Sequence, residues 1–275
     1  MDNDLNTLVA WTAAAEWETG QKSDPPISGG TTMKEYDDAT YGDRIAGVYD
    51  ALYPGFEEAA IDLLHELAGR GRALELGIGT GRVALPLAGR GVEITGIDTS
   101  PAMITALQAK PGASGIEVVQ GSFAQFEMED RFNLAYVAFN TFFALQTQEE
   151  QVACFQSVAR HLTTGGVFLI EAFVPDPGRF DRDQTVQVVG ISEDVVNLDV
   201  ALHDSVRQQV RSQHVVLSEK GLHLYPVKLR YAWPSELDLM ARLAGLKLVH
   251  SWGSWDRSEF TAESGKHISV YGAAI

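Results

Sequence analysis

The sequence has a single cysteine, Cys154, among its 275 residues. A lone thiol can form neither an internal disulfide nor a cysteine-based metal cluster, so Cys154 is expected to be a small buried residue of a helical stretch. No apolar run approaches the roughly 20 residues of a membrane-spanning helix, and the first residues lack the positive charge that opens a secretory signal. These absences predict a cytoplasmic protein that has no contact with a membrane.

Basic residues are also scarce. The chain has 21 Lys and Arg against 37 Asp and Glu, which gives a formal net charge of −16. Such a surface repels phosphates, so nucleic acid is not expected as a partner, and a neutral or cationic small molecule fits better. The histidines lack the spacing of a metal site, so no metal is predicted.

The residues from 73 to 82 read Ala-Leu-Glu-Leu-Gly-Ile-Gly-Thr-Gly-Arg. A short apolar strand that ends in Glu75 is followed by Gly77, Gly79 and Gly81, and a helical pattern begins directly afterwards. Glycine lets the backbone approach a ligand that a Cβ would exclude, and the helix start offers unpaired N–H groups. A nucleotide-like ligand is therefore implied.

A second predicted strand ends in Asp98, about 20 residues beyond the first glycine, where a nucleotide-binding βαβ unit holds the ribose hydroxyls. The dinucleotide fingerprint requires a further glycine where this chain has Arg82. A nicotinamide cofactor therefore fits poorly, although an oxidoreductase stays open as an alternative.

An acidic residue in the first strand, followed by Gly-x-Gly-x-Gly, resembles the first motif of the class I S-adenosylmethionine-dependent methyltransferases. Residues 162–166, Leu-Thr-Thr-Gly-Gly, are similar to the Leu-x-Pro-Gly-Gly turn before that family's fifth strand. The resemblance implies an α/β fold with a doubly wound, seven-stranded, Rossmann-like sheet, and S-adenosylmethionine as the cofactor. The turn at Ser122 and Phe123 would read the adenine, although the family usually has Asp at the position of Ser122.

The order of patterns along the chain divides it into segments. Residues 1–32 are an apolar-periodic stretch and a linker, expected to be a mobile extension or a contact in a possible homodimer. Residues 33–71 are predicted to be a helical cap. Residues 72–175 and 231–275 are predicted to form the cofactor-binding domain, and residues 176–230 an inserted antiparallel β lid.

Two segments have more detailed expectations. In the cap, Pro54 is expected to end one helix near Leu52. In the insertion, period-two alternation predicts four strands over the active site. Their expected ranges are 184–189, 195–202, 206–217 and 222–231.

The resemblance also implies the residues of the cofactor site. They are Tyr41, Tyr49, Glu75, Gly77, Gly79, Gly81, Arg82, Asp98, Thr99, Ser122, Phe123, Phe139 and Asn140. Cap tyrosines like those of the amino-sugar and antibiotic N-methyltransferases would close over the methionine moiety and shape the acceptor pocket, or they simply pack the cap against the sheet. Asn140 would hold the methionine ammonium or the acceptor through its amide.

The predicted catalytic residues are Tyr53, Glu171 and His214. Glu171, at the end of the fifth strand, would attract a protonated amine and later take its proton if it faces the cleft. If it is turned away, it is a solvated or salt-bridged side chain. His214 is preferred among the strand histidines as a general base, because it lies at the centre of a strand expected to cross the lid. Phe142 and Phe143 are expected to line the acceptor pocket, with core packing as the alternative.

The expected function is methyl transfer from S-adenosylmethionine to an amine of a small molecule, a natural product or a sugar. An amine with a free lone pair needs little acid-base chemistry, whereas a hydroxyl or carbon acceptor needs a base. The sequence has no evident His-Asp or His-Glu base motif, which favours nitrogen. O- or C-methylation and a non-catalytic cofactor-binding module remain alternatives.

Overall fold

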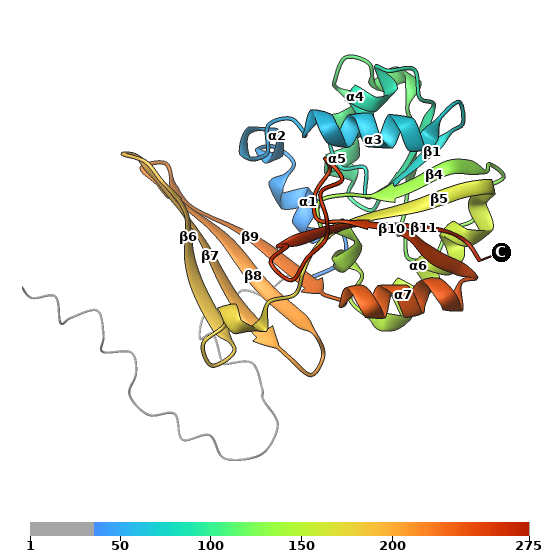
Figure 1. Cartoon of the computed structure of the whole chain (residues 1–275). Helices are drawn as coiled ribbons and strands as arrows, with labels where there is room; N and C mark the ends of the chain where they lie inside the picture. Colours follow the sequence, from blue (N-terminus) through green and yellow to red (C-terminus); the bar gives the residue numbers. More distant parts are fainter. Residues whose placement is uncertain (1–35, 275) are drawn as a thin grey trace, which may run out of the picture. The chain divides into compact units, whose positions relative to one another are not determined.

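Seven strands form the main sheet of the structure (Figure 1), a computed structural model that describes residues 36–274. The strands are β1 (Ala73–Leu76), β2 (Ile94–Asp98), β3 (Glu117–Gln120), β4 (Phe132–Val137), β5 (Leu162–Phe173), β10 (Leu246–Trp252) and β11 (Lys266–Ala273). Their order is β10-β11-β5-β4-β1-β2-β3. β11 runs antiparallel to β5 and β10, and the other neighbours are parallel. The predicted doubly wound, seven-stranded sheet is confirmed. The predicted extension at residues 1–32 lies outside the described residues.

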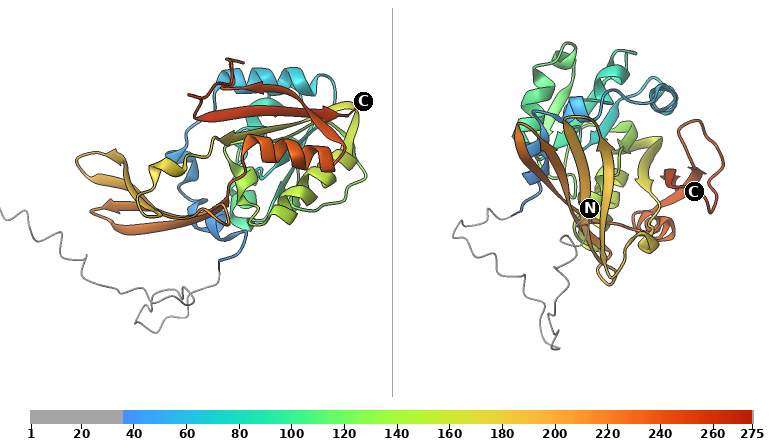
Figure 2. Two further views of the ribbon diagram at one scale, coloured as in Figure 1. Left: turned by 60° about the horizontal axis from the view of Figure 1, so that its bottom comes forward. Right: turned by 90° about the vertical axis from the view of Figure 1, so that its left-hand side faces the viewer.

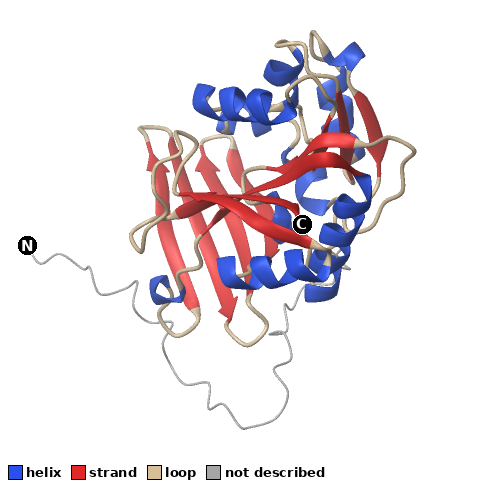
Figure 3. Cartoon of the chain, turned by 45° about the vertical axis from the view of Figure 1, so that its right-hand side comes forward, coloured by secondary structure: helices blue, strands red, loops and turns tan. Residues whose placement is uncertain are grey.

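Helices lie on both sides of this sheet (Figure 3). They are α3 (Glu58–Ala68), α4 (Ala84–Ala88) and α5 (Pro101–Gln108) on one side, and α6 (Gln148–His161) and α7 (Pro234–Leu243) on the other. All four residues of β1 are buried, as expected for a parallel strand that is covered on both faces. In α6, the buried side chains include Cys154 and Phe155.

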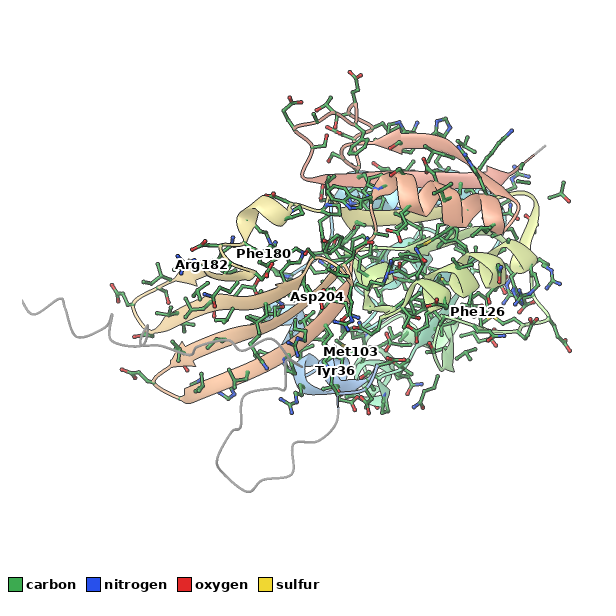
Figure 4. The ribbon with its side chains drawn as sticks, turned by 90° about the horizontal axis from the view of Figure 1, so that it is seen from below. Tyr36, Met103, Phe126, Phe180, Arg182 and Asp204 are labelled. Atoms are coloured by element: carbon green, nitrogen blue, oxygen red, sulfur yellow. The ribbon has the colours of Figure 1, made fainter. Side chains whose placement is uncertain are left out.

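The cap consists of α1 (Thr40–Ile45) and α2 (Tyr49–Leu52), ahead of α3. The predicted helix end before Pro54 is confirmed, because α2 stops at Leu52. The cap is attached to α5, where the Ser100 hydroxyl donates a hydrogen bond of 2.6 Å to Asp43. Ile45 packs with Met103 of α5 and Tyr225 in one apolar cluster, and Figure 4 labels Met103 at this junction.

A second, four-stranded antiparallel sheet extends beyond the main body (Figure 2). It contains β6 (Gln184–Ile191), β7 (Val195–Asp204), β8 (Gln209–Ser218) and β9 (Gly221–Arg230), and we call it the lid. The expected antiparallel sheet is therefore present. β8 begins three residues later than expected, because Asp204 accepts the N–H groups of Val206 and Arg207 and so fixes a turn there.

One strand of the main sheet also begins earlier than expected. β5 starts at Leu162, so residues 162–166, expected as a turn, belong to the strand. Leu162 pairs with Phe132, and the register then shifts before Leu134 pairs with Val167. The glycine-containing segment is thus an irregular strand start.

Among the described residues, no helix has the length and apolarity needed to cross a membrane.

Close packing between β2 and the glycine turn generates the first prediction. A Cβ added at Gly96 would lie 2.7 Å from Ile78 Cβ, closer than real Cβ contacts allow. We expect Gly96→Ala to lower the free energy of unfolding by about 1–3 kcal/mol, because the buried turn must shift. Urea denaturation followed by circular dichroism measures this change. Gly115→Ala, with no atom within 4 Å of the added Cβ, is the control, and an equal loss in both variants would contradict the packing argument.

Candidate active site

A cavity of about 370 Å³ lies beside the carboxyl ends of β1 and β2. The glycine turn and the strand ends contribute Gly77, Gly79, Asp98, Thr99 and Phe123; the cap contributes Tyr36, Asp38, Tyr41, Tyr49 and Tyr53; the lid contributes Asp199, Val210, Ser212, His214, Val227 and Leu229. Figure 4 labels Tyr36, whose hydroxyl accepts a hydrogen bond of 3.2 Å from the Lys228 N–H of the lid. The strands that follow β1 are added on one side of it as far as β3, and β4 is then placed on its other side. Open α/β folds bind ligands at this switch point. The motif, the cap and the lid therefore share one ligand site.

Asp98 connects the elements at the floor of this cavity. Its Oδ2 accepts the Gly79 N–H at 2.8 Å, and its Oδ1 accepts the Ser100 N–H at 2.8 Å. Burial raises the pKa of Asp98 above its usual value. Next to it, the Thr99 hydroxyl donates to the Asp38 carbonyl oxygen at 3.1 Å, so Thr99 joins the cavity floor to the cap.

Glu75 lies almost completely buried in β1, with 4% of its surface exposed. Its Oε2 accepts a hydrogen bond of 2.8 Å from the hydroxyl of Tyr136 on β4. Burial raises the pKa of Glu75 to about 8, and the nearby Arg82 opposes part of that rise. Glu75, Gly77 and Arg82 border a small recess next to the main cavity. Tyr136 could not be identified from the sequence, because its hydrogen bond with Glu75 depends on the pairing of β1 with β4.

The three motif glycines have different surroundings. All have positive φ values, of 73° for Gly77, 55° for Gly79 and 78° for Gly81. A Cβ added at Gly79 would meet nothing within 4 Å, whereas one at Gly81 would clash with Leu107 of α5 and press on Leu85 of α4 at 3.2 Å. Gly79 thus faces open space, and Gly81 permits close packing of the turn against α4 and α5.

Arg82 is surrounded by aromatic rings. Its guanidinium carbon lies 4.2 Å from the ring centroid of Phe139, 4.9 Å from that of Phe56 and 5.9 Å from that of Tyr53. It also donates to the carbonyl oxygen of Gly55 at 3.3 Å. Arg82 therefore connects the cap to the loop after β4.

The loop after β4 is held in a strained conformation. Phe139 and Asn140 both have positive φ, of 55° and 65°. The Asn140 side-chain oxygen accepts the Phe173 N–H at 2.7 Å, so part of the amide that was expected to hold a ligand already holds the loop. Both residues line the main cavity. Such paired outliers are typical of positions fixed for ligand contact.

Glu171 is buried and has three hydrogen-bond donors. Its Oε2 accepts the Phe139 N–H at 2.7 Å, and its Oε1 accepts from Trp255 Nε1 at 3.0 Å and Lys266 Nζ at 3.2 Å. These bonds occupy the carboxylate that was expected to attract the acceptor amine. The arrangement favours the salt-bridged alternative, in which Glu171 supports the loop after β4.

Phe142 and Phe143 have no exposed surface. Phe142 packs on Phe155 with ring centroids 5.5 Å apart, and Phe143 packs on Phe173 at 4.9 Å. Neither lines the main cavity. The expectation that they line the acceptor pocket is therefore corrected to core packing, because the short helix at Thr141–Ala144 turns both rings inward.

The adenine turn agrees in part with the expectation. Phe123 lines the cavity, and its ring would lie 3.6 Å from a Cβ at Gly77. The hydroxyl of Ser122 accepts the Ala124 N–H at 3.2 Å, and Ser122 is not among the residues that line the cavity. Ser122 therefore shapes the turn, and its contact with a base stays a prediction.

The lid presents a histidine and a carboxylate to the cavity. His214 on β8 and Asp199 on β7 are directly paired in the sheet, and His214 Nδ1 lies 3.2 Å from Asp199 Oδ1. Asp199 Oδ1 is buried and makes no hydrogen bond with any of the described residues, so His214 stands at ion-pair distance from a carboxylate oxygen that has no other use. The ring of Tyr41 meets His214 edge-on, with 6.4 Å between centroids. A His-Asp pair of this kind can take and hold a proton.

The open space above Gly79 generates the second prediction. We expect Gly79→Ala to weaken the binding of S-adenosylmethionine, the cofactor implied by the sequence, by at least about tenfold, because the methyl group occupies ligand space. Titration calorimetry measures this affinity. Gly245→Ala is a matched control, since Gly245 also has positive φ, 76°, and no atom within 4 Å of an added Cβ. Unchanged affinity in Gly79→Ala would show that the turn does not face the ligand.

The raised pKa of Glu75 generates a third prediction. With a pKa of about 8, Glu75 carries its proton at pH 6.5 in the free protein. A methionine ammonium in the adjoining recess would stabilise the carboxylate, so cofactor binding should release about one proton per site. Calorimetry in two buffers of different ionisation enthalpy measures the release. Glu75→Gln should release none, and equal heats in both buffers for the unaltered protein would refute the coupling.

Comparison with known proteins agrees with this geometry. Residues 73–166 match a family described as a methyltransferase domain. The CcbJ methyltransferase of Streptomyces caelestis is 40% identical, with a TM-score of 0.82 over 87% of this chain and 100% of its own. The cypemycin N-terminal methyltransferase of a Streptomyces species is 29% identical over 90% of this chain and 98% of its own.

One solved structure of similar fold contains S-adenosylmethionine. CalS10, an amino pentose methyltransferase of Micromonospora echinaspora, was solved with S-adenosylmethionine bound. It is 21% identical, with a TM-score of 0.65 over 82% of this chain and 97% of its own, and this likeness concerns the fold. The glycine turn, Asp98 and the 40% identity to CcbJ together lead to one conclusion: the chain belongs to the S-adenosylmethionine-dependent methyltransferases and is an enzyme of that family.

Proposed function

We propose that the protein transfers the methyl group of S-adenosylmethionine to an amine of a small natural product or sugar. The observation that carries this proposal is the cavity in which the cofactor motif meets Asp199 and His214 of the lid. Asp38 of the cap lines the same cavity. Two carboxylates and a ring of tyrosines suit a cationic acceptor, because carboxylates and aromatic faces both stabilise ammonium groups.

The names of similar proteins support nitrogen as the methylated atom. The cypemycin enzyme is named for methylation at a peptide N-terminus, and CalS10 for an amino pentose. KedS8 of Streptoalloteichus is named a sugar N-methyltransferase. These names describe those proteins, and they raise the expectation of an amine acceptor here.

The residues of the site fit the cofactor. Asp98 would accept the ribose hydroxyls, Gly79 leaves room for the ligand, and the recess at Glu75 suits a cation. When bound, the cofactor supplies an activated methyl group with a thioether leaving group. The role of the protein is then to align the acceptor and to exclude water, effects that in model reactions reach about 7–11 kcal/mol.

The lid residues would remove a proton from the acceptor. His214 would accept the proton from the acceptor ammonium, and Asp199, 3.2 Å from its Nδ1, would hold the ring and stabilise its charged form. The nitrogen lone pair then forms the new N–C bond as the C–S bond breaks. Tyr53, whose ring packs 5.1 Å from that of Phe139, would serve through its shape, as part of the wall.

O-Methylation is a second candidate function. The sequence favoured nitrogen because it offered no evident base, but the structure brings His214 and Asp199 together from two strands. Such a pair is what a hydroxyl acceptor requires. Nitrogen is therefore favoured by the charge of the cavity and by the names of the similar proteins, and not by the lack of a base.

The fourth prediction tests the acceptor class. The assay supplies S-adenosylmethionine with amino sugars and peptide N-termini, each beside its hydroxyl analogue, and mass spectrometry locates the new methyl group. We expect amines to be methylated, and His214→Gln to lower kcat/KM by about 10- to 100-fold near neutral pH. The defect should shrink as the pH rises, because the free amine then forms without a base.

A second lid histidine, His223, serves as the control. His223→Gln changes an exposed lid histidine outside the cavity walls, and its rate should stay within about twofold. Methyl groups found on oxygen, with a His214→Gln defect that persists at every pH, would establish O-methylation instead. Cofactor binding with no turnover on any acceptor would favour a non-catalytic module.

A further inference from the structure

The lid sheet has two faces of opposite character. In an antiparallel sheet, directly paired residues point to the same side. Asp199, His214 and Tyr225 are paired across three strands and point towards the cavity and the cap. The residues that alternate with them point the other way.

We call this other side the outer face. Cross-strand pairing places twelve apolar residues on it: Val186, Val188, Ile191, Val196, Leu198, Val200, Leu202, Val215, Leu217, Leu222, Leu224 and Pro226. Eight of their side chains are exposed, from 37% at Val200 to 76% at Ile191. The outer face is therefore a mainly apolar surface in contact with solvent, with Gln213 as a polar residue between Val200 and Pro226.

Its size is at the upper end of the range for apolar surface patches. Strands spaced about 4.8 Å apart and rising about 3.3 Å per residue give a four-stranded sheet of this length a face of roughly 600 Å². Soluble monomers seldom expose more than a few hundred Å² of contiguous apolar surface. A standard interface buries about 800 Å² on each partner, so the outer face has roughly three quarters of the area of one side of an interface.

Charge distribution indicates what kind of surface covers it. The charged side chains on the outward positions of these strands stand at the ends next to the main body, at Asp204, Arg211, Lys228 and Arg230. With a net charge of −16, two copies of this chain repel each other over most of their surfaces. Because the outer face is uncharged over its middle, two copies approach there with less repulsion than at their charged surfaces.

We propose that the outer face of the lid is the interface of a homodimer. Two lids pack face to face about a twofold axis, and each copy's Val, Leu and Ile side chains cover those of the other. Sheets that pack in this way bury alternate side chains and leave the opposite faces free. The inner faces, with His214 and Asp199, then point away from the interface, each towards its own cavity.

The fifth prediction follows from this arrangement. Sedimentation velocity across the micromolar range should find a dimer for the unaltered protein. The double substitution Val188→Lys with Leu224→Lys should raise the dimer dissociation constant at least about 100-fold, because four ammonium groups would have to be desolvated in the interface. Leu243→Lys, on the exposed surface of α7 away from the lid, is the matched control and should leave the dimer intact.

A second double variant distinguishes loss of the interface from misfolding. Val188→Ser with Leu224→Ser removes apolar area without adding charge, and should weaken the dimer by about tenfold or more. Circular dichroism and S-adenosylmethionine binding check that each variant is folded. An unaltered protein that sediments as a monomer would overturn the proposal. So would folded lysine and serine variants that dimerise as tightly as the control.

Discussion

The cavity depends on one hydrogen bond, from the N–H of Gly79 to the carboxylate of Asp98. It joins the glycine turn after β1 to the end of β2. The other Asp98 oxygen holds the N–H of Ser100, whose hydroxyl accepts from Met103 and donates to Asp43 of the cap. A single carboxylate thus fixes the ligand turn, the start of α5 and, through Ser100, the position of the cap. The bonds from Asp98 to Ser100 and from Ser100 to Met103 are local in sequence, whereas those to Gly79 and Asp43 join segments 19 and 57 residues apart.

Side chains alternate between the two faces of the lid strands, so one face lines the cavity and the other forms the apolar outer face. On β8, His214 points to the cavity, and its neighbour Val215 points to the outer face. One-residue slippage would exchange them, burying apolar groups in the polar cavity and exposing the His-Asp pair. Hairpin connections and the apolar outer face therefore specify the same register that brings Asp199 to His214. Catalytic geometry and surface character come from one constraint.

Sequence was sufficient where structure is local. The glycine turn, Asp98, the break at Pro54 and the strands follow from short patterns, and the structure confirms the fold. It was insufficient where side chains meet across the fold. Glu171 binds Trp255 and Lys266, 84 and 95 residues away, and no pattern along the chain signals such partners. Likewise, Asp199 and His214 are common residues on separate strands, and only the pairing register makes them a candidate catalytic pair.

Alignment of the acceptor and general-base catalysis contribute differently to the rate, and their relative size decides whether the His-Asp pair identifies the acceptor atom. Alignment supplies about 7–11 kcal/mol in favourable cases, while a general base supplies about 10²- to 10⁴-fold, or roughly 3–5.5 kcal/mol. An amine that is deprotonated in solution already has its nucleophilic lone pair, so alignment alone then carries its reaction. A hydroxyl needs both effects in every turnover. The pair formed by His214 and Asp199 is therefore compatible with either acceptor, and the dependence of the rate on that pair, rather than its presence, distinguishes nitrogen from oxygen.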